Sequence, residues 1–319
     1  MNLSIAIPDS ALLDESTVLY KTKKVSMIAR ACAIFKIKEI IIYRDGKENK
    51  NDSTLLSTLL KYLETPQYFR KQLFPKTNLL KYSGVLQPLN ISNHLTTSNQ
   101  KLVKIGDIRD GLIVNYKGKK FVDIGINKLI PYFGKIMYGT RIAIKIIATD
   151  PKFTIKEIPR EDVKDYWGYK VKERGNLFSI LSSWTGKIIL TSKKGKIFTG
   201  SDTEKFIKSN EPMLLVFGTT NKGIHEILGT DIKKVQNSKI LNFFPDQATQ
   251  TVRLEEAILG ILSIINSYKY IKFWKISSMA IKKNFLVLAI IVGIIGISLG
   301  GYTIFESINN MISITNSLP

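Results

Sequence analysis

Hydrophobic and polar positions follow two different periods in the first 65 residues. Residues 3–7 (LSIAI) and 39–43 (EIIIY) are short apolar runs, each followed by turn residues, and they predict buried strands. Residues 24–35 and 53–63 carry apolar side chains at helical spacing and predict helices. Strand, helix, strand and helix at these lengths predict an α/β layer with parallel strands.

The middle of the chain shows a different pattern. Short strand-like runs follow one another between residues 101 and 147, with a Lys117–Gly118 turn between two of them. This pattern predicts a small OB-like β-barrel inserted into the α/β layer, and residues 101–160 make it basic, with 13 basic against 5 acidic side chains. Such barrels bind single strands with a charged face and stacked aromatic rings. The aromatic candidates, each of which would also suit a core, are Tyr116, Phe121, Tyr132, Phe133 and Tyr138.

The α/β pattern resumes after about Tyr166. A helix over residues 201–209 is predicted from a capping box of Ser201 and Glu204, and another over 251–266 from a continuous apolar stripe. Three further buried strands are predicted over residues 187–190, 213–217 and 240–244.

The last part of the chain holds a long apolar run. Phe285 to Phe305 contains no charged residue, and 21 residues at about 1.5 Å each reach across a bilayer core of roughly 30 Å. Lysines precede the run, and neither Lys nor Arg follows it. By the positive-inside rule we expect a single-pass membrane protein, bound to the lipid bilayer through Phe285–Phe305, with its N-terminal catalytic part cytoplasmic.

Charge and cysteine content narrow the class of partner. The 47 Lys and Arg against 26 Asp and Glu give a net charge of +21, which attracts polyanions such as nucleic acid or an anionic membrane surface. A merely solubilising lysine-rich surface is the alternative interpretation. Cys32 is the only cysteine, so the chain has no internal disulfide and no cysteine-based metal cluster. His94 and His225 show no metal-ligand spacing, and no metal is expected.

Two strand ends are candidates for chemistry. Residues 217–224 (FGTTNKGI) form a glycine-punctuated loop after one strand, and residues 242–250 (NFFPDQATQ) lead from another strand into the last helix. Ligands of parallel sheets bind where strands end and loops begin. Neither loop matches a P-loop or a G-x-G-x-x-G motif, so the pattern alone predicts a small-molecule cleft and no particular reaction.

Several segments together resemble one family, the archaeal and eukaryotic branch of the SPOUT RNA methyltransferases that carries an OB-like insertion. The resemblance runs over nearly all of residues 3–268 and is most specific in the last segment. Its clearest pieces are KTKKVSMIARACAIF (21–35), IIIYRD (40–45), GVLQPL (84–89), GDIRDG (106–111), DYWGYKV (165–171), VFGTTNKGIHEIL (216–228) and NFFPDQATQTVRLEEAILGILSIIN (242–266). The resemblance implies a trefoil-knotted domain that binds S-adenosyl-L-methionine and forms a homodimer across the knot.

The same resemblance assigns site residues. Arg30, Arg253 and Glu256 are the implied catalytic residues, and Glu255 is an alternative base to Glu256. The sequence also departs from the family pattern, since Ala248 stands where the family has a glycine. The implied cofactor-binding residues are Phe217, Gly218, Thr219, Gly223, Phe244, Pro245, Gln247, Thr251 and Val252. The alternative interpretation is structural: Arg253 and Glu256 form an ion pair on one helix. Carboxylates are also favoured in the first turn of a helix without any catalytic role. Asp246 also replaces a family glycine; if these two positions need a positive φ, Ala248 is strained and Asp246 tolerable.

These observations lead to one primary hypothesis. We expect a membrane-tethered SPOUT homodimer that methylates structured ribosomal or transfer RNA. The rival is a membrane-anchored RNA-binding protein without catalysis, which keeps the knot as a dimer scaffold. The expected division is a SPOUT domain over 1–84 and 161–273, an OB-like RNA-binding insertion over 85–160, a basic linker over 274–284, a transmembrane helix over 285–305 and a short tail over 306–319.

Overall fold

A computed structural model of the chain describes residues 2–46, 50–95, 97–199, 201–202, 211–219 and 222–268. The chain divides into two compact units, Met1–Ile265 and Asn266–Pro319, and the sheets and sites below lie in the first.

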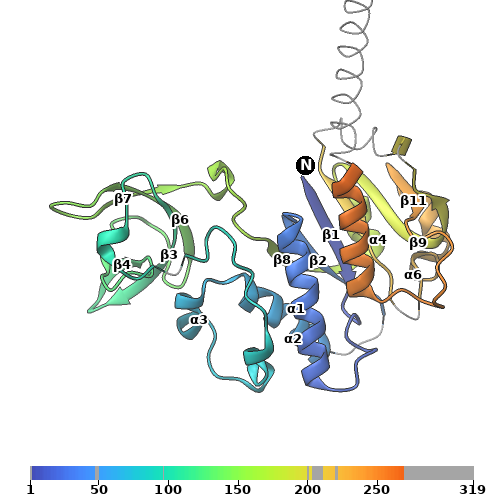
Figure 1. Cartoon of the computed structure of the whole chain (residues 1–319), viewed down its shortest axis with the longest axis horizontal. Coiled ribbons are helices and arrows are strands. Elements are labelled where there is room, and N and C mark those ends of the chain that lie inside the picture. The colour runs from blue at the N-terminus through green and yellow to red at the C-terminus, as the bar shows by residue number, and fades with distance from the viewer. Residues whose placement is uncertain are drawn as a thin grey trace, which may run out of the picture. The chain divides into compact units, whose positions relative to one another are not determined.

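A six-stranded parallel sheet forms one layer of this unit (Figure 1). The strand order is β11-β9-β10-β1-β2-β8, and every neighbouring pair is parallel. This confirms the predicted parallel α/β layer. The strands are β1 (Leu3–Pro8), β2 (Glu39–Arg44), β8 (Lys170–Asn176), β9 (Lys187–Ile197), β10 (Met213–Val216) and β11 (Ser238–Asn242).

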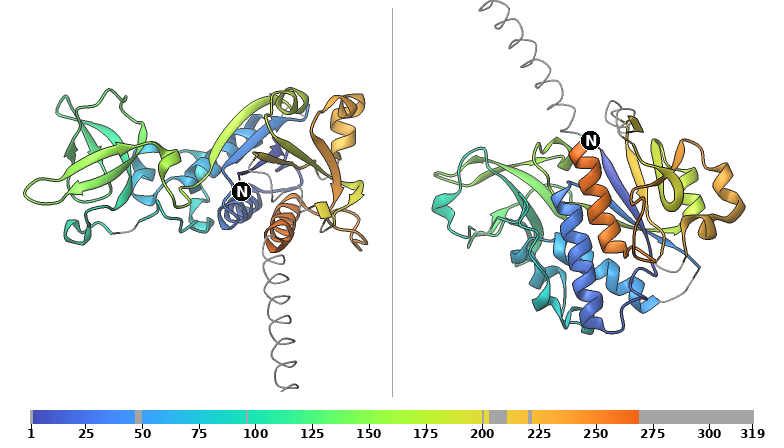
Figure 2. Two further views of the ribbon diagram at one scale, coloured as in Figure 1. Left: turned by 90° about the horizontal axis from the view of Figure 1, so that it is seen from above. Right: turned by 45° about the vertical axis from the view of Figure 1, so that its right-hand side comes forward.

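Helices cover both faces of this sheet, which is why its central strands are apolar on both sides. Alternate residues of β1 point in opposite directions: Ile5 belongs to a core with α1, α2 and the helix over residues 254–268, while Ala6 belongs to a core with α4 and α6. Figures 1 and 2 show α1 and the helix over residues 254–268 side by side. The α-helices of the described residues include α1 (Val18–Ile34), α2 (Lys50–Glu64), α3 (Gln67–Leu73), α4 (Leu177–Ser182) and α6 (Ile224–Leu228), and short 3-10 turns lie between some of them.

A second sheet lies within the sequence between β2 and β8. Its five antiparallel strands have the order β5-β4-β3-β6-β7 and enclose a separate apolar core. The Tyr132 hydroxyl, just after β5, donates to Glu157 of β7 at 3.0 Å, so a side-chain contact links the two ends of the sheet. The strands are β3 (Ile108–Tyr116), β4 (Lys119–Asp123), β5 (Ile130–Pro131), β6 (Arg141–Ala148) and β7 (Thr154–Ile158). The OB type of this insertion, the knot and the domain boundaries stay predictions.

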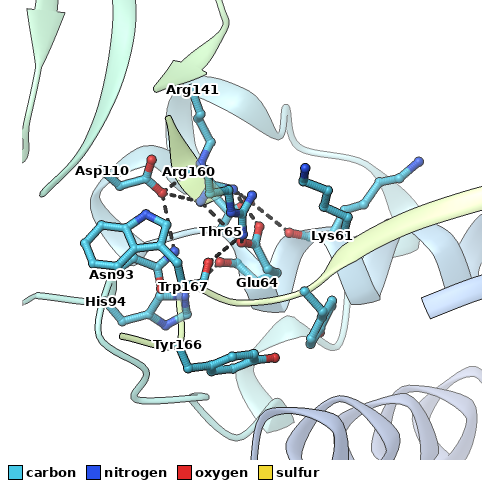
Figure 3. A network of polar contacts seen from close by, with 12 residues as sticks. Lys61, Glu64, Thr65, Asn93, His94, Asp110, Arg141, Arg160, Tyr166 and Trp167 are labelled. Carbon is cyan, nitrogen blue, oxygen red and sulfur yellow. Dashed lines mark hydrogen bonds and ion pairs between the residues drawn. The ribbon is translucent and has the colours of Figure 1, made fainter. Parts of the chain in front are cut away.

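A buried ion-pair network joins the insertion to α2 (Figure 3). Arg141 of β6 donates to Glu64 at 2.6 Å and also binds Asp110 of β3, and Arg160 donates to Glu64 at 2.8 Å. Burial raises the pKa of Glu64, and the two arginines oppose that rise. Burial alone would lower the pKa of Arg141, but Glu64 and Asp110 raise it above its ordinary value. We call Glu64, Asp110, Arg141 and Arg160 the Arg141 network.

The predicted membrane localisation is wrong. Within the described residues, no helix is both long enough and apolar enough to cross a bilayer. The prediction rested on the apolar run Phe285–Phe305 and on the lysines before it, and this run lies outside the described residues, as do the predicted linker and tail. Most of the predicted helix over 201–209, including Glu204 of its capping box, also lies outside them.

Candidate active site

A cavity of about 340 Å³ opens at the carboxyl ends of β9, β10 and β11. Its walls come from four segments: residues 191–194 within β9, the loop after β10, the loop after β11, and the helix that begins at residue 254. This is the edge at which ligands of parallel sheets bind, because loops and helix N-termini converge there. The volume falls within the usual range of about 300–1,000 Å³ for small-molecule sites.

The first wall arises from an interruption in β9. Ile240 of β11 pairs with Leu190 and Leu241 pairs with Lys196, so the residues between them leave the ladder. The position of this segment is fixed by a hydrogen bond in which the Asn242 side-chain amide donates to the carbonyl of Lys193 at 3.1 Å. The sequence prediction missed this wall, because a lysine-rich stretch within a strand gives no signal that it loops out.

The loop after β10 requires a glycine at its start. A Cβ added to Gly218 would lie 2.9 Å from the carbonyl oxygen of Lys222, closer than real Cβ atoms approach. Thr219 and Lys222 close the turn: the Thr219 N–H donates to the Lys222 carbonyl at 2.9 Å, and the Lys222 N–H donates to the Thr219 hydroxyl at 2.7 Å. The backbone therefore lies directly at the cavity wall, unshielded by a side chain at Gly218.

The loop after β11 is ordered by its own side chains. The Phe244 N–H donates to the Asn242 side chain at 2.9 Å, and the Gln247 amide donates to the carbonyl of Thr249 at 2.9 Å. Of the two residues that replace family glycines, Asp246 has a φ of +59° and Ala248 is not among the residues with positive φ. Ala248 therefore carries none of the backbone strain considered from the sequence.

The structure brings most of the predicted cofactor residues together. Of the nine, all except Pro245 line the cavity: Phe217, Gly218, Thr219, Gly223, Phe244, Gln247, Thr251 and Val252. Pro245 lies in the same loop, between Phe244 and Gln247. His225 also lines the cavity, and its Nε2 atom is buried without a hydrogen-bond partner among the described residues.

The three predicted catalytic residues do not line the cavity. The Arg30 guanidinium donates to the carbonyl of Pro88 at 2.7 Å. Arg253 follows Val252 of the cavity wall and pairs with Glu15 at 3.2 Å. Glu256 accepts a hydrogen bond from the Arg253 N–H at 2.9 Å, the geometry of a helix cap, so a capping contact stands in place of the side-chain pairing considered as the alternative.

Glu255, the alternative base, belongs to a buried ion cluster. Lys24 of α1 is buried and lies 2.6 Å from the Asp14 carboxylate and 3.2 Å from that of Glu255. The cluster ties α1 to the start of the helix that forms one cavity wall. Because a cation already neutralises it, the Glu255 carboxylate has a structural role in this arrangement.

An acidic pair at the ends of β1 and β2 was not predicted. The Ser10 hydroxyl donates to Asp45, and the Asp45 N–H donates to Asp9 at 3.3 Å. Burial, together with the nearby Asp45 charge, raises the pKa of Asp9 to about 6. The Tyr43 hydroxyl donates to the carbonyl of Phe217 at 2.6 Å and so links this edge to the cavity wall.

The comparison with protein families places the chain in the class of RNA methyltransferases. Residues 2–265 match the family described as "Putative RNA methyltransferase", and the chain belongs to this family. The predicted enzyme class is confirmed at this level; the finer SPOUT assignment is consistent with it.

Two relatives carry a more specific name. The chain is 27% identical over 303 residues to the 28S rRNA (uridine-N(3))-methyltransferase of Drosophila melanogaster, with 82% of this chain and 61% of that protein covered. It is 26% identical over 300 residues to the human protein of the same name, with 82% and 77% covered. A solved "probable methylase family protein" from Haemophilus influenzae aligns with a TM-score of 0.39 at 10% identity, covering 88% of this chain and 70% of that one, a likeness that carries no argument about function.

Proposed function

We propose that this chain transfers a methyl group from S-adenosyl-L-methionine to N3 of a uridine in ribosomal RNA, and that the cavity at the ends of β9, β10 and β11 holds the cofactor. The observation that carries the proposal is the convergence of the two predicted loops on one cavity, in a chain of an RNA methyltransferase family. The names of the insect and human relatives supply the nucleotide and the atom.

The cavity residues fit the chemistry of this cofactor. Leu241, Phe243 and Ile261 give apolar walls for an adenine ring, and at Gly218 no side chain stands between the backbone and the cavity. The unpartnered Nε2 of His225 offers a polar contact that a ligand would satisfy. Apolar walls with a few polar groups are typical of sites for small molecules.

When bound, S-adenosyl-L-methionine supplies a methyl group on a positively charged sulfur, and a uridine nitrogen can accept it only after losing its proton. We assign to Arg253, directly after the cavity wall, the role of holding the uridine while negative charge develops on it. Glu256 holds the Arg253 backbone through the 2.9 Å capping bond and is our candidate for receiving the proton. Arg30 is our candidate for a contact with the RNA backbone near the acceptor.

A homodimer is part of the proposal. Tyr20, Met27 and Ile34 are exposed apolar residues spaced seven apart on α1, so they share one helix face. Leu259, on the helix beside α1, is exposed as well. Such a surface supports an isologous contact between two copies of the chain.

The test combines cofactor binding with methyl transfer. Isothermal titration of the full chain with S-adenosyl-L-methionine should show binding that Ala257→Trp abolishes, because Ala257 lines the cavity, whereas Asn266→Trp, at an exposed position of the same helix, should bind normally. Tritium transfer to ribosomal RNA followed by nucleoside mass spectrometry should give N3-methyluridine. Absence of cofactor binding at millimolar concentration would overturn the proposal.

A further inference from the structure

The insertion presents an aromatic ring to solvent, far along the sequence from the cavity residues. Phe133, just after β5, is 96% exposed, although burying a phenylalanine side chain is worth about 1.5–3 kcal/mol. Met137, four residues later, is 76% exposed. A cluster of exposed apolar side chains in a basic domain marks a contact surface.

This segment is anchored on both sides of the exposed ring. The Tyr132 N–H donates to the Lys120 carbonyl at 3.0 Å, and the Lys120 ammonium donates to the Ile136 carbonyl at 2.9 Å. Between these anchors the chain turns tightly, since a Cβ on Gly134 would lie 2.2 Å from the Tyr132 hydroxyl oxygen. The backbone on both sides of Phe133 is therefore bonded to residues of β4, so less backbone entropy remains to be lost on binding.

One lysine ammonium group lies beside each of two half-exposed tyrosine rings of the insertion. The Lys120 ammonium lies 5.6 Å from the centre of the half-exposed Tyr138 ring, and that of Lys117 lies 5.4 Å from the centre of Tyr116, also half-exposed. Residues 111–140 contain one acidic side chain, Asp123, and the Gln72 amide already donates to it at 2.9 Å. The basic side chains of the same stretch are Lys117, Lys119, Lys120, Lys128 and Lys135.

We propose that Phe133, Tyr138, Lys120 and Lys135, here called the Phe133 surface, bind unpaired nucleotides of RNA, with Phe133 stacking on a base. Flat rings beside ammonium groups match the two parts of a nucleotide, a base with a π-face and a phosphate. A duplex offers no free base face to Phe133, so single strands and loops are the ligand class. The inference rests on the proposed function, because it takes RNA as substrate, and adds which part of the RNA the insertion contacts.

The experiment measures the fluorescence anisotropy of a labelled 12-nucleotide single-stranded RNA of mixed sequence on the full chain at 150 mM KCl. Phe133→Ala should weaken binding about 5- to 100-fold, the usual range for loss of one stacked base. Phe133→Tyr should retain most of the affinity, and Phe133→Leu, which is apolar but cannot stack, should behave like Phe133→Ala. Ile105→Ala is the matched control, because Ile105 is 68% exposed on the same insertion and has no role in the inference.

The outcomes separate this inference from the proposed function. If Phe133→Ala or Phe133→Leu binds the single strand within twofold of the wild type, the inference is overturned. Binding of a matched RNA hairpin duplex as tight as that of the single strand also overturns it. Cofactor titration should be the same in all four variants, so a failure of the proposed function appears there and a failure of this inference appears only in RNA binding.

Discussion

Arg141 offers a quantitative test of how the two sheets are held together. Its side chain is 18% exposed, and the Glu64 and Asp110 carboxylates beside it are 7% and 5% exposed. In an Arg141→Met variant Glu64 keeps Arg160, whereas the Asp110 carboxylate keeps, within the described structure, only the Asn93 amide at 3.4 Å. The variant therefore leaves one buried carboxylate without a cation.

Breaking a buried pair in this way costs about 3–5 kcal/mol. For a unit of this size each kcal/mol lowers the midpoint of thermal unfolding by about 2–4 °C, so Arg141→Met should lower it by about 6–20 °C. Calorimetry and urea unfolding measure the change. Adding Asp110→Asn to Arg141→Met should restore part of the loss, because the uncompensated charge disappears.

The matched control is Lys61→Met. Lys61 lies 2.9 Å from Glu173, but the two side chains are 48% and 52% exposed, and pairs of this kind contribute about 0–1 kcal/mol. If Arg141→Met destabilises the protein no more than Lys61→Met does, the network is not what fixes the insertion, and the reasoning fails.

Three further changes test other parts of the structure. Burial lowers the pKa of His94 from 6.5 to about 4, so as the pH falls the unfolded chain takes up a proton on His94 before the folded chain does. Up to about 3 kcal/mol of the free energy of unfolding is therefore lost between pH 6.5 and pH 4, and this loss should be missing in His94→Gln. Asp9, whose pKa is raised, contributes in the opposite direction, and comparing the unfolding profiles of the two proteins cancels that contribution. Lys24→Met should cost about 3–5 kcal/mol in urea unfolding, because Asp14 and Glu255 lose their cation, and a loss below 1 kcal/mol would contradict the structural role of that cluster. Gly218→Ala should weaken cofactor binding in calorimetry by about tenfold or more, since its Cβ meets backbone at 2.9 Å, whereas Gly175→Ala, outside the cavity wall and with nothing within 4 Å, should bind nearly as the wild type does.

The parallel layer could be predicted because its strands are buried on both faces. Residues 3–7 alternate apolar and small side chains, residues 40–43 are continuously apolar, and both segments are strands in the structure. The strand β8 was missed because it lies at the edge of the sheet, where KVKERGN needs no apolar face. The helix predicted from residue 24 begins at Val18, because the Thr17 hydroxyl caps it, and the residues between are too polar to show a helical stripe.

The candidate site, like the fold, could be predicted only in part from the sequence. Loops with glycine or proline after a buried strand can be found in a sequence, and the loops at Gly218 and Phe244 meet at one cavity. The wall formed by residues 191–194 and the contact of Arg141 with Glu64 could not be found, because each depends on partners far away in the chain. The proposed roles of Arg30, Arg253 and Glu256 came from family resemblance, which carries chemistry that spacing alone does not.

The position of α2 explains why a polar network is suited to holding the insertion. Leucines along α2, among them Leu56, Leu59 and Leu63, are buried in the core of the parallel sheet, so the helix cannot slide. Glu64 is the next residue, and its carboxylate is therefore fixed relative to that core. An apolar contact at this point would tolerate several orientations of the insertion, whereas the directional bonds from Arg141 and Arg160 to one carboxylate admit few. The buried charges of the network, costly in stability, thus tie the orientation of the antiparallel sheet to the layer that carries the cavity.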